Sequence, residues 1–87
     1  MITITNDNEF TTVEELRQGL LDVIETELEE YEPEDTGWSN YSMEEINTLI
    51  DRYLNEVTDM EIDEYNEECG FGDRDEAIMC YINEWAF

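Results

Sequence analysis

The sequence predicts a mainly α protein: a small helical domain of three to four amphipathic helices with a short N-terminal β-strand, or else an α+β domain. Three observations lead to this prediction. Four capping signals, in which Ser, Thr or Asp is followed three residues later by Glu, are spread along the chain. Apolar residues recur at helical spacing after these signals. The 87 residues suit one domain, residues 1–87, and 40% of them are hydrophobic, a supply that disordered acidic tails lack.

The chain is expected to begin with a strand. Ile2 and Ile4 alternate with Thr3 and Thr5, which is the two-residue period of a half-buried strand. Residues 6–9 are polar and are expected to form a turn or loop.

The first helix is expected at about 13–31. Thr12 and Glu15 form a capping box at its start, and Pro33 stops it. Seven apolar residues recur at helical spacing, namely Val13, Leu16, Leu20, Leu21, Ile24, Leu28 and Tyr31. At 100° per residue the opposite face carries Glu14, Asp22, Glu25, Glu29 and Glu32.

The second helix is expected at about 43–57, after a loop at 33–41. Ser42 and Glu45 make a capping box, and Tyr41 and Ile46 stand at the two ends of a hydrophobic staple. The apolar face comprises Ile46, Leu49, Ile50, Tyr53, Leu54 and Val57.

Residues 58–69 are ambiguous between helix and strand. Thr58 and Glu61 could cap a helix that ends at Gly70, which favours helix, but Met60 and Ile62 alternate as in a short strand. After a turn at 70–72, a fourth capping box opens a last helix at about 74–86. Its box is formed by Asp73 and Glu76, and its apolar face by Ile78, Tyr81, Ile82 and Trp85.

The charge excludes several functions. There are 26 acidic residues, three arginines, no lysine and no histidine, so the net charge is −23. Binding to nucleic acid through its phosphates, and adhesion to an anionic membrane, both need a basic surface that this chain cannot build. Chemistry that uses histidine as base, nucleophile or metal ligand is excluded as well.

The two cysteines, Cys69 and Cys80, are eleven residues apart without a CxxC pattern. We expect two buried free thiols in a reducing compartment, and a disulfide is the alternative. Residues 1–5 lack the basic start and apolar run of a signal peptide, and no stretch approaches about 20 apolar residues. A cytoplasmic location is therefore expected.

Neither a metal site nor an active site is expected. Residues 59–67 resemble a calcium loop in having oxygens at positions 1, 3 and 5, but they lack the glycine at position 6, and Gly70 replaces the glutamate at position 12. Two cysteines without histidine cannot complete a zinc site. With 26 carboxylates, the proximity of two is uninformative about acid–base catalysis. We expect no enzyme activity and no cofactor.

The arginines have local explanations and are assigned no active role. Arg17 can pair with Glu14, and Arg52 with Glu56, across one helical turn. Arg74 stands near the start of the last helix, where neighbouring acids offset its unfavourable position in the helix dipole. These acids are Asp73, Asp75 and Glu76.

The acidic face of the first helix is the sharpest candidate site. Residues three and four apart lie about 5–6 Å apart at Cβ, and like charges at that spacing cost about 0.2–0.5 kcal/mol per pair. Because no lysine alternates with the acids, the field itself is expected to be used, although plain solubility is the alternative. The candidate partner-binding carboxylates are Glu14, Asp22, Glu25, Glu29, Glu30, Glu32, Glu34, Asp35, Asp59, Glu61, Asp63, Glu64, Glu67 and Glu68. The loop aromatics Trp38 and Phe71 are candidates either for core lids or for interface anchors.

In size and charge pattern, though in no specific motif, the chain resembles the small acidic DNA mimics of phages and mobile elements, which include anti-restriction and anti-CRISPR proteins. The resemblance implies an inhibitor in the cytoplasm of a bacterial host. It would be a monomer or homodimer that binds no nucleic acid itself. It would occupy the basic nucleic-acid-binding site of a nuclease, CRISPR effector or restriction enzyme.

Three other functions stay open. The strand-then-helix start and the acidic surface look like the barstar class, which suggests an immunity or antitoxin-type inhibitor of one basic nuclease. That inhibitor would depend on a hot-spot patch, whereas a mimic would use a spread array. The other two are a weak divalent-cation-binding protein and an accessory protein whose charge serves solubility.

Overall fold

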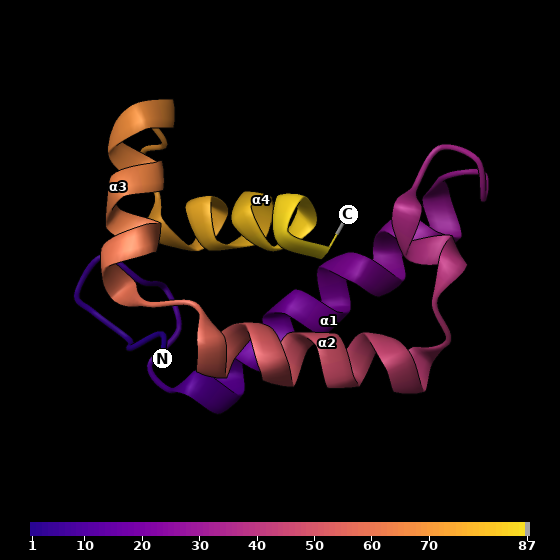
Figure 1. Ribbon diagram of the computed structural model, residues 1–87, viewed down its shortest axis with the longest axis horizontal. Helices are drawn as coiled ribbons and strands as arrows, with labels where there is room; N and C mark the ends of the chain where they lie inside the picture. The colour runs from indigo at the N-terminus through magenta and orange to yellow at the C-terminus, as the bar shows by residue number, and fades with distance from the viewer. Residues whose placement is uncertain (87) are drawn as a thin grey trace.

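The computed structural model describes residues 1–86, and these form four α-helices and one 3₁₀-helix but no β-strand. The α-helices are α1 (Val13–Glu30), α2 (Met43–Glu56), α3 (Asp59–Cys69) and α4 (Arg74–Ala86), and the 3₁₀-helix is η1 (Gly37–Asn40). The mainly α prediction is therefore confirmed (Figure 1).

The helices pack around one centre. α1 contacts α2 and η1, while α4 contacts α2 and, most extensively, α3. In Figure 1, α1, α2 and α4 run across the molecule, and α3 stands crosswise at one end of α4. The fold measures 34 × 24 × 20 Å along its principal axes.

The start of α1 differs from the predicted capping box. The Thr12 hydroxyl accepts a hydrogen bond from the Glu15 backbone N–H at 3.1 Å, as expected. The Glu15 carboxylate, however, accepts from the N–H and hydroxyl of Thr11, at 2.9 and 2.8 Å, and these bonds lower the pKa of Glu15. The helix ends at Glu30, slightly before the predicted end, so Glu32 lies in the following turn and not on the helix face.

α2 begins as predicted. The Glu45 N–H donates to the Ser42 hydroxyl and the Ser42 N–H donates to the Glu45 carboxylate, both at 3.2 Å, so this capping box is complete. The helix ends at Glu56, with Val57 as its cap.

The ambiguous segment is a helix, α3, which confirms the favoured prediction. The Thr58 hydroxyl accepts from the Glu61 N–H at 3.3 Å, and Gly70 ends the helix with φ of +70°, a conformation that favours glycine.

α4 also forms where predicted, but the predicted capping box between Asp73 and Glu76 is wrong. The Asp73 carboxylate accepts from the Asp75 N–H at 3.0 Å, one residue earlier than a box with Glu76 requires.

The predicted strand at residues 2–5 is wrong. The Ile2 N–H donates to the Leu54 carbonyl at the end of α2, and the Thr3 N–H donates to the Asp59 carboxylate at 2.7 Å. Ile2 is fully buried and Ile4 half-buried. The segment thus satisfies its apolar pattern against helices, without the partner strand that a sheet needs.

The core is built from all four helices, η1 and the N-terminal segment. Its fully buried residues include Tyr53, whose hydroxyl donates to the Ile78 carbonyl of α4 at 2.7 Å. Burial raises the pKa of Tyr53. Tyr31, which was predicted on the apolar face, is instead 54% exposed because α1 ends before it. The core residues are Ile2, Leu16, Leu20, Leu21, Ile24, Trp38, Ile46, Ile50, Tyr53, Leu54, Val57, Ile62, Ile78 and Ile82.

Candidate partner-binding surface

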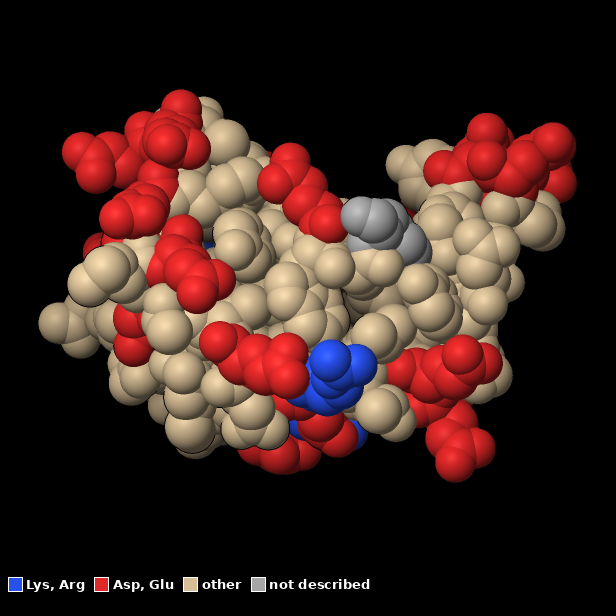
Figure 2. All heavy atoms as spheres, in the orientation of Figure 1, with Lys and Arg blue, Asp and Glu red and all other residues tan. Residues whose placement is uncertain are grey.

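The carboxylates are spread over the surface in separate groups. All but four of the 26 acidic residues are exposed, and the exceptions Glu27, Asp59, Asp73 and Asp75 are half-buried. Figure 2 shows separate red groups with tan surface between them, including groups over the end of α3 and over the loop that follows α1. A surface of this charge attracts cations, most strongly where carboxylates gather.

The row predicted on the first helix exists on α1 for four of its five members. Glu14, Asp22, Glu25 and Glu29 are exposed. A hydrogen bond from Gln18 Nε2 to Asp22 Oδ1, at 3.1 Å, fixes the side chain of one member of the row. The helix holds Asp22, Glu25 and Glu29 at three- and four-residue spacings, and Glu14 lies eight residues before Asp22.

The turn after α1 carries a second acidic group. Glu30, Glu32, Glu34 and Asp35 are all exposed there, in the part of the chain that projects at the upper right of Figure 2. No arginine pairs with any of them among the ion pairs of residues 1–86.

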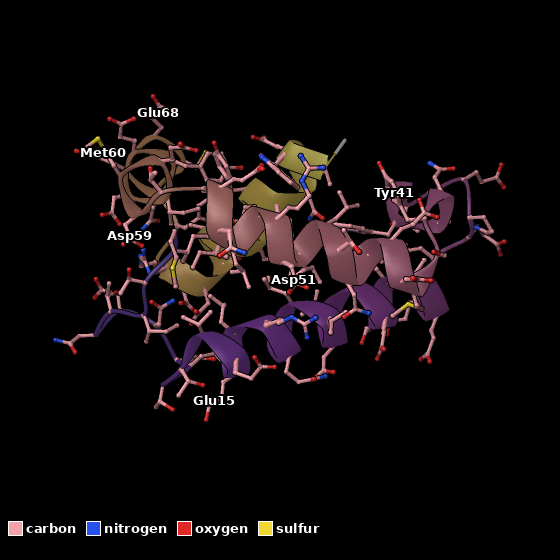
Figure 3. The ribbon with its side chains drawn as sticks, turned by 60° about the horizontal axis from the view of Figure 1, so that its bottom comes forward. Glu15, Tyr41, Asp51, Asp59, Met60 and Glu68 are labelled. Atoms are coloured by element: carbon pink, nitrogen blue, oxygen red, sulfur yellow. The ribbon has the colours of Figure 1, made fainter. Side chains whose placement is uncertain are left out.

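The third group lies on α3. Its exposed members are Glu61, Asp63, Glu64, Glu67 and Glu68. Glu68 points away from the fold at the far end of α3 (Figure 3). Two members have partners, since Glu61 accepts from the Tyr81 hydroxyl at 3.0 Å and Asp63 lies 3.5 Å from Arg74.

Asp59 is the predicted site carboxylate that the fold uses internally. It is half-buried, and its Oδ1 accepts from the Thr3 N–H and from Arg74 Nη2, both at 2.7 Å. Burial raises the pKa of Asp59, but the hydrogen bonds from Thr3 and Arg74 and the arginine charge outweigh it, so the pKa lies below its ordinary value. Asp59 therefore holds the N-terminal segment, which makes it less available to a partner than the fully exposed acids.

Arg74 is the centre of this internal network. Its side chain is only 3% exposed, although the sequence placed it beside surface acids of its own helix. Its guanidinium donates to the Thr3 carbonyl at 2.7 Å, to Asn8 Oδ1 at 2.8 Å and to Asp59 at 2.7 Å. Its partners are thus not the predicted acids beside it in the sequence. Arg74 instead joins the start of α4 to the N-terminal segment and to the start of α3.

The other two arginines lie on or beside α2. Arg17 pairs with Asp51 at 2.7 Å, across α1 and α2, and only weakly with the predicted Glu14, at 3.9 Å. The hydrogen bond to Asp51 raises the pKa of Arg17. Arg52 pairs with Glu56 at 3.7 Å, as predicted, and its guanidinium also lies 5.8 Å from the centre of the Trp85 ring.

These pairs offset part of the charge of the α2 side. The blue atoms in Figure 2 lie over α2, with red atoms directly beside them and further red groups over α3 and the loop after α1. The acids that stand in groups are those of the α1 row, the following turn and α3, and among residues 1–86 only Glu14 and Asp63 of these groups form ion pairs. These three groups are called the acidic array below.

Sequence reasoning missed the acids of α2. Glu44, Glu45, Asp51 and Glu56 are exposed, and the helical-wheel argument used for the first helix would have found them. Three of the four already have partners in Ser42, Arg17 and Arg52. They contribute to the total field but less to the acidic array.

The two loop aromatics have different environments. Trp38 is 1% exposed, and its indole N–H donates to Asn83 Oδ1 at 2.8 Å, so it is a core lid and not an interface anchor. Phe71 is half-buried and packs on Tyr65 with ring centres 5.7 Å apart.

Both cysteines are free, as predicted, but they are not both buried. Cys69 is exposed at the end of α3, and Cys80 is half-buried on α4. Burial, together with nearby carboxylates such as Glu76, raises the pKa of the Cys80 thiol. Neither thiol has the electropositive surroundings of a catalytic cysteine.

The tightest acidic cluster was not predicted. One carboxylate oxygen from each of Glu9, Asp73 and Asp75 lies within 4.8 Å of the others. The Asp75 carboxylate accepts hydrogen bonds from Asn8 Nδ2 and from the Glu9 N–H, which brings the loop before α1 against the start of α4. The cluster arises from tertiary contact between residues more than 60 positions apart, so no local sequence signal reveals it.

Comparison with known proteins adds no relative: no protein-family model, curated protein sequence or solved structure matches this chain. Among residues 1–86, no helix combines the length and apolar character that crossing a bilayer requires.

Proposed function

We propose that this chain is a DNA-mimic inhibitor. It binds the basic nucleic-acid-binding site of a DNA-processing or host-defence protein, of the anti-restriction or anti-CRISPR type, and so keeps DNA out. The proposed activity is binding alone, without a catalytic step.

The observation that carries the proposal is the density of charge along the fold. A net charge of −23 over a longest axis of 34 Å gives about 1.5 Å per charge. Duplex DNA carries one charge per about 1.7 Å of its axis. The protein therefore has the length of about one turn of duplex and a comparable charge.

The rigidity of the acidic array also supports mimicry. α1, α2 and α3 have hydrogen-bonded N-terminal caps, and their apolar faces meet in one core. The carboxylates of α1 and α3 thus keep fixed separations, as the phosphates of a duplex do, and binding orders little backbone. A disordered acidic tail would carry the same charge without that geometry.

The three arginines offset little of the array, because each one is paired within the fold and only Glu14 and Asp63 of the array take part in these pairs. Arg74 is buried, and Arg17 and Arg52 are bound to carboxylates on or beside α2. A basic groove would therefore approach the α1 and α3 acids without meeting an unpaired cation. Association would be steered electrostatically and would weaken steeply with salt, as DNA binding does.

The test is capture of binding proteins from a bacterial lysate on the immobilised chain, at about 50 mM salt, where charge-driven binding is strong. Bound proteins are eluted in parallel with a short DNA duplex and with polyglutamate of equal total charge. We expect nucleic-acid-binding proteins that the duplex elutes at lower charge concentration than polyglutamate does.

A matched variant separates the acidic array from bulk charge. Glu25→Gln with Glu29→Gln removes two charges from the α1 row, while Glu45→Gln with Glu56→Gln removes two from the α2 side. The first pair should weaken capture more than the second. Capture of no nucleic-acid-binding protein at low salt, or equal elution by DNA and polyglutamate, would refute the proposal.

A further inference from the structure

A cavity with an apolar floor and an acidic rim opens beside the start of α4. Its volume is about 290 Å³, just below the roughly 300–1,000 Å³ of most small-molecule sites, so it suits a side chain better than a cofactor. The floor is formed by Phe10, Leu16, Gly19, Leu20, Val23 and Met79, and the rim by Glu9, Asp73, Asp75 and Glu76.

Part of the floor is accessible apolar surface, whereas Leu16 and Leu20 are buried beneath it. Val23 on α1 is 43% exposed, and Phe10 and Met79 are half-buried. Gly19 lets the Phe10 ring lie directly against α1, because a Cβ at that position would collide with the end of the ring. Glycine inside a helix costs up to about 1 kcal/mol relative to alanine, so its place here is explained by the close approach of the ring.

The rim has the opposite character. Oxygens of Glu9, Asp73 and Asp75 come within 4.8 Å of one another, and Glu76 is exposed beside them. Asp75 is held in place by the Asn8 amide and the Glu9 N–H. An uncharged apolar ligand would leave these carboxylates uncompensated at the edge of the cavity, whereas a cationic group would neutralise them.

A lysine side chain combines the two properties that this cavity requires. Its four methylenes can lie along Phe10, Val23 and Met79 while the ammonium reaches the rim. An ammonium has three donors, and acceptors at about 2.7–3.2 Å around one nitrogen lie within about 5 Å of each other. That separation agrees with the 4.8 Å cluster, whereas a guanidinium fork prefers the two oxygens of one carboxylate.

We propose that this cavity, defined here as the lysine pocket, anchors one lysine side chain of the protein partner. The occupant is not a second copy of this chain, because the chain contains no lysine and would repel itself at −23. The inference rests on the proposed function, since it places one hot spot beside the acidic array. The phosphate backbone of DNA offers no apolar pocket, so a mimic that bound through charge alone would not distinguish basic partners. The lysine pocket would favour those partners that place a lysine opposite it.

The test is NMR titration of the ¹⁵N-labelled chain with n-butylammonium chloride, which carries the ammonium and the four-carbon stem of lysine. Ammonium chloride, 1-butanol and n-propylguanidinium chloride are titrated at matched ionic strength. We expect saturating shifts at the amides of Phe10, Val23 and Met79 with n-butylammonium, and weaker binding of the other three.

Variants locate the binding. Glu76→Gln removes a rim charge and should weaken n-butylammonium binding about two- to fivefold, the range for a partly exposed ion pair. Val23→Ser should weaken it by removing floor surface. Glu29→Gln, an equal charge change on the α1 row, should leave it unchanged. Dispersed amide spectra of each variant check the fold.

Several results would overturn the lysine pocket. Equal binding of 1-butanol would make it an apolar crevice only, and equal or tighter binding of ammonium or propylguanidinium would remove the selectivity for lysine. Saturation of the same amides by Ca²⁺ at lower concentration than by n-butylammonium would make it a metal site. Retained protein capture and DNA competition in Val23→Ser would show that the proposed function stands even if the lysine pocket fails.

Discussion

Replacing Arg74 with methionine should destabilise the protein far more than the loss of an ordinary surface arginine. The Arg74 side chain is 3% exposed and donates to Thr3, Asn8 and Asp59, with Asp63 at 3.5 Å. Methionine fills a similar volume but removes these charged hydrogen bonds, and Asp59 and Asn8 keep their bonds from the Thr3 and Thr5 N–H groups.

The expected cost is about 3 kcal/mol. Breaking a fully buried ion pair costs about 3–5 kcal/mol, but Asp59 and Asp63 are 38% and 68% exposed, so water recovers part of that loss. One charge-assisted hydrogen bond contributes about 1.5–3 kcal/mol, and the acceptors on Thr3 and Asn8 add to it. At about 4–8 °C per kcal/mol for a domain of this size, the melting temperature should fall by about 12–24 °C.

Arg52→Met is the matched control. It removes the same charge from the chain, so the general increase in self-repulsion is equal in both variants. The Arg52 side chain is 59% exposed and pairs with Glu56 at 3.7 Å, a helix pair worth about 0.3–0.5 kcal/mol. Any larger loss in Arg74→Met therefore measures the internal network.

The assay is urea unfolding followed by circular dichroism at pH 7. Arg74→Lys, which keeps the charge but loses the planar fork, should fall between the wild type and Arg74→Met, and it provides a measurement if the methionine variant does not fold. Destabilisation of Arg74→Met within about 0.5 kcal/mol of Arg52→Met would refute the reasoning, since surface changes have that size.

Four further predictions follow from the structure. Raising sodium chloride from 10 to 300 mM should raise the melting temperature, because screening relieves the repulsion among unopposed carboxylates; a flat or falling value in calorimetry would contradict this. Brief iodoacetamide treatment at pH 8, followed by peptide mass spectrometry, should label Cys69 well before Cys80, because the Cys80 thiol is half-buried and has a raised pKa. Equal labelling rates of the two cysteines would contradict this prediction. Gly19→Ala should lower the urea midpoint despite the better helix propensity of alanine, because the Phe10 ring must move; a raised midpoint would show that the ring yields easily. The folded-state pKa of Asp59 is lowered, so the stabilisation from its ionised form is complete above about pH 4 and is lost as the pH falls through the lowered pKa. The difference in unfolding free energy between wild type and Asp59→Asn should therefore be largest near pH 7 and shrink below about pH 4. A difference that stays constant with pH in urea titrations would contradict this prediction.

The helices could be predicted because their signals are local. Ser42 and Glu45 lie three residues apart, and their mutual hydrogen bonds at the start of α2 need no contact with the rest of the chain. Gly70 likewise marks the end of α3 through its own backbone angle. The exposure of the carboxylates also followed from composition, since so many charges cannot be buried.

The remaining features depend on distant contacts. Arg74 could not be matched to Thr3 from the sequence, since 71 residues separate them and closer acids offered simpler pairs. The alternation at residues 2–5 predicts a strand only if another strand exists to pair with it. Here the segment bonds instead to Leu54 at the end of α2 and to Asp59 at the start of α3. The lysine pocket also depends on docking of the loop before α1 against α4.

The arginine network has a consequence for the order in which the chain is made. Thr3 leaves the ribosome early, yet its partners Asp59 and Arg74 follow 56 and 71 residues later. Until then the buried Ile2 can contact only the earlier helices, through its hydrogen bond to the Leu54 carbonyl. Because synthesis proceeds at about 5–20 residues per second, several seconds pass between the synthesis of Thr3 and that of Arg74. The contacts of Thr3 with Asp59 and Arg74 thus form late, and a chain truncated before Arg74 would lack the hydrogen bond to the Thr3 carbonyl.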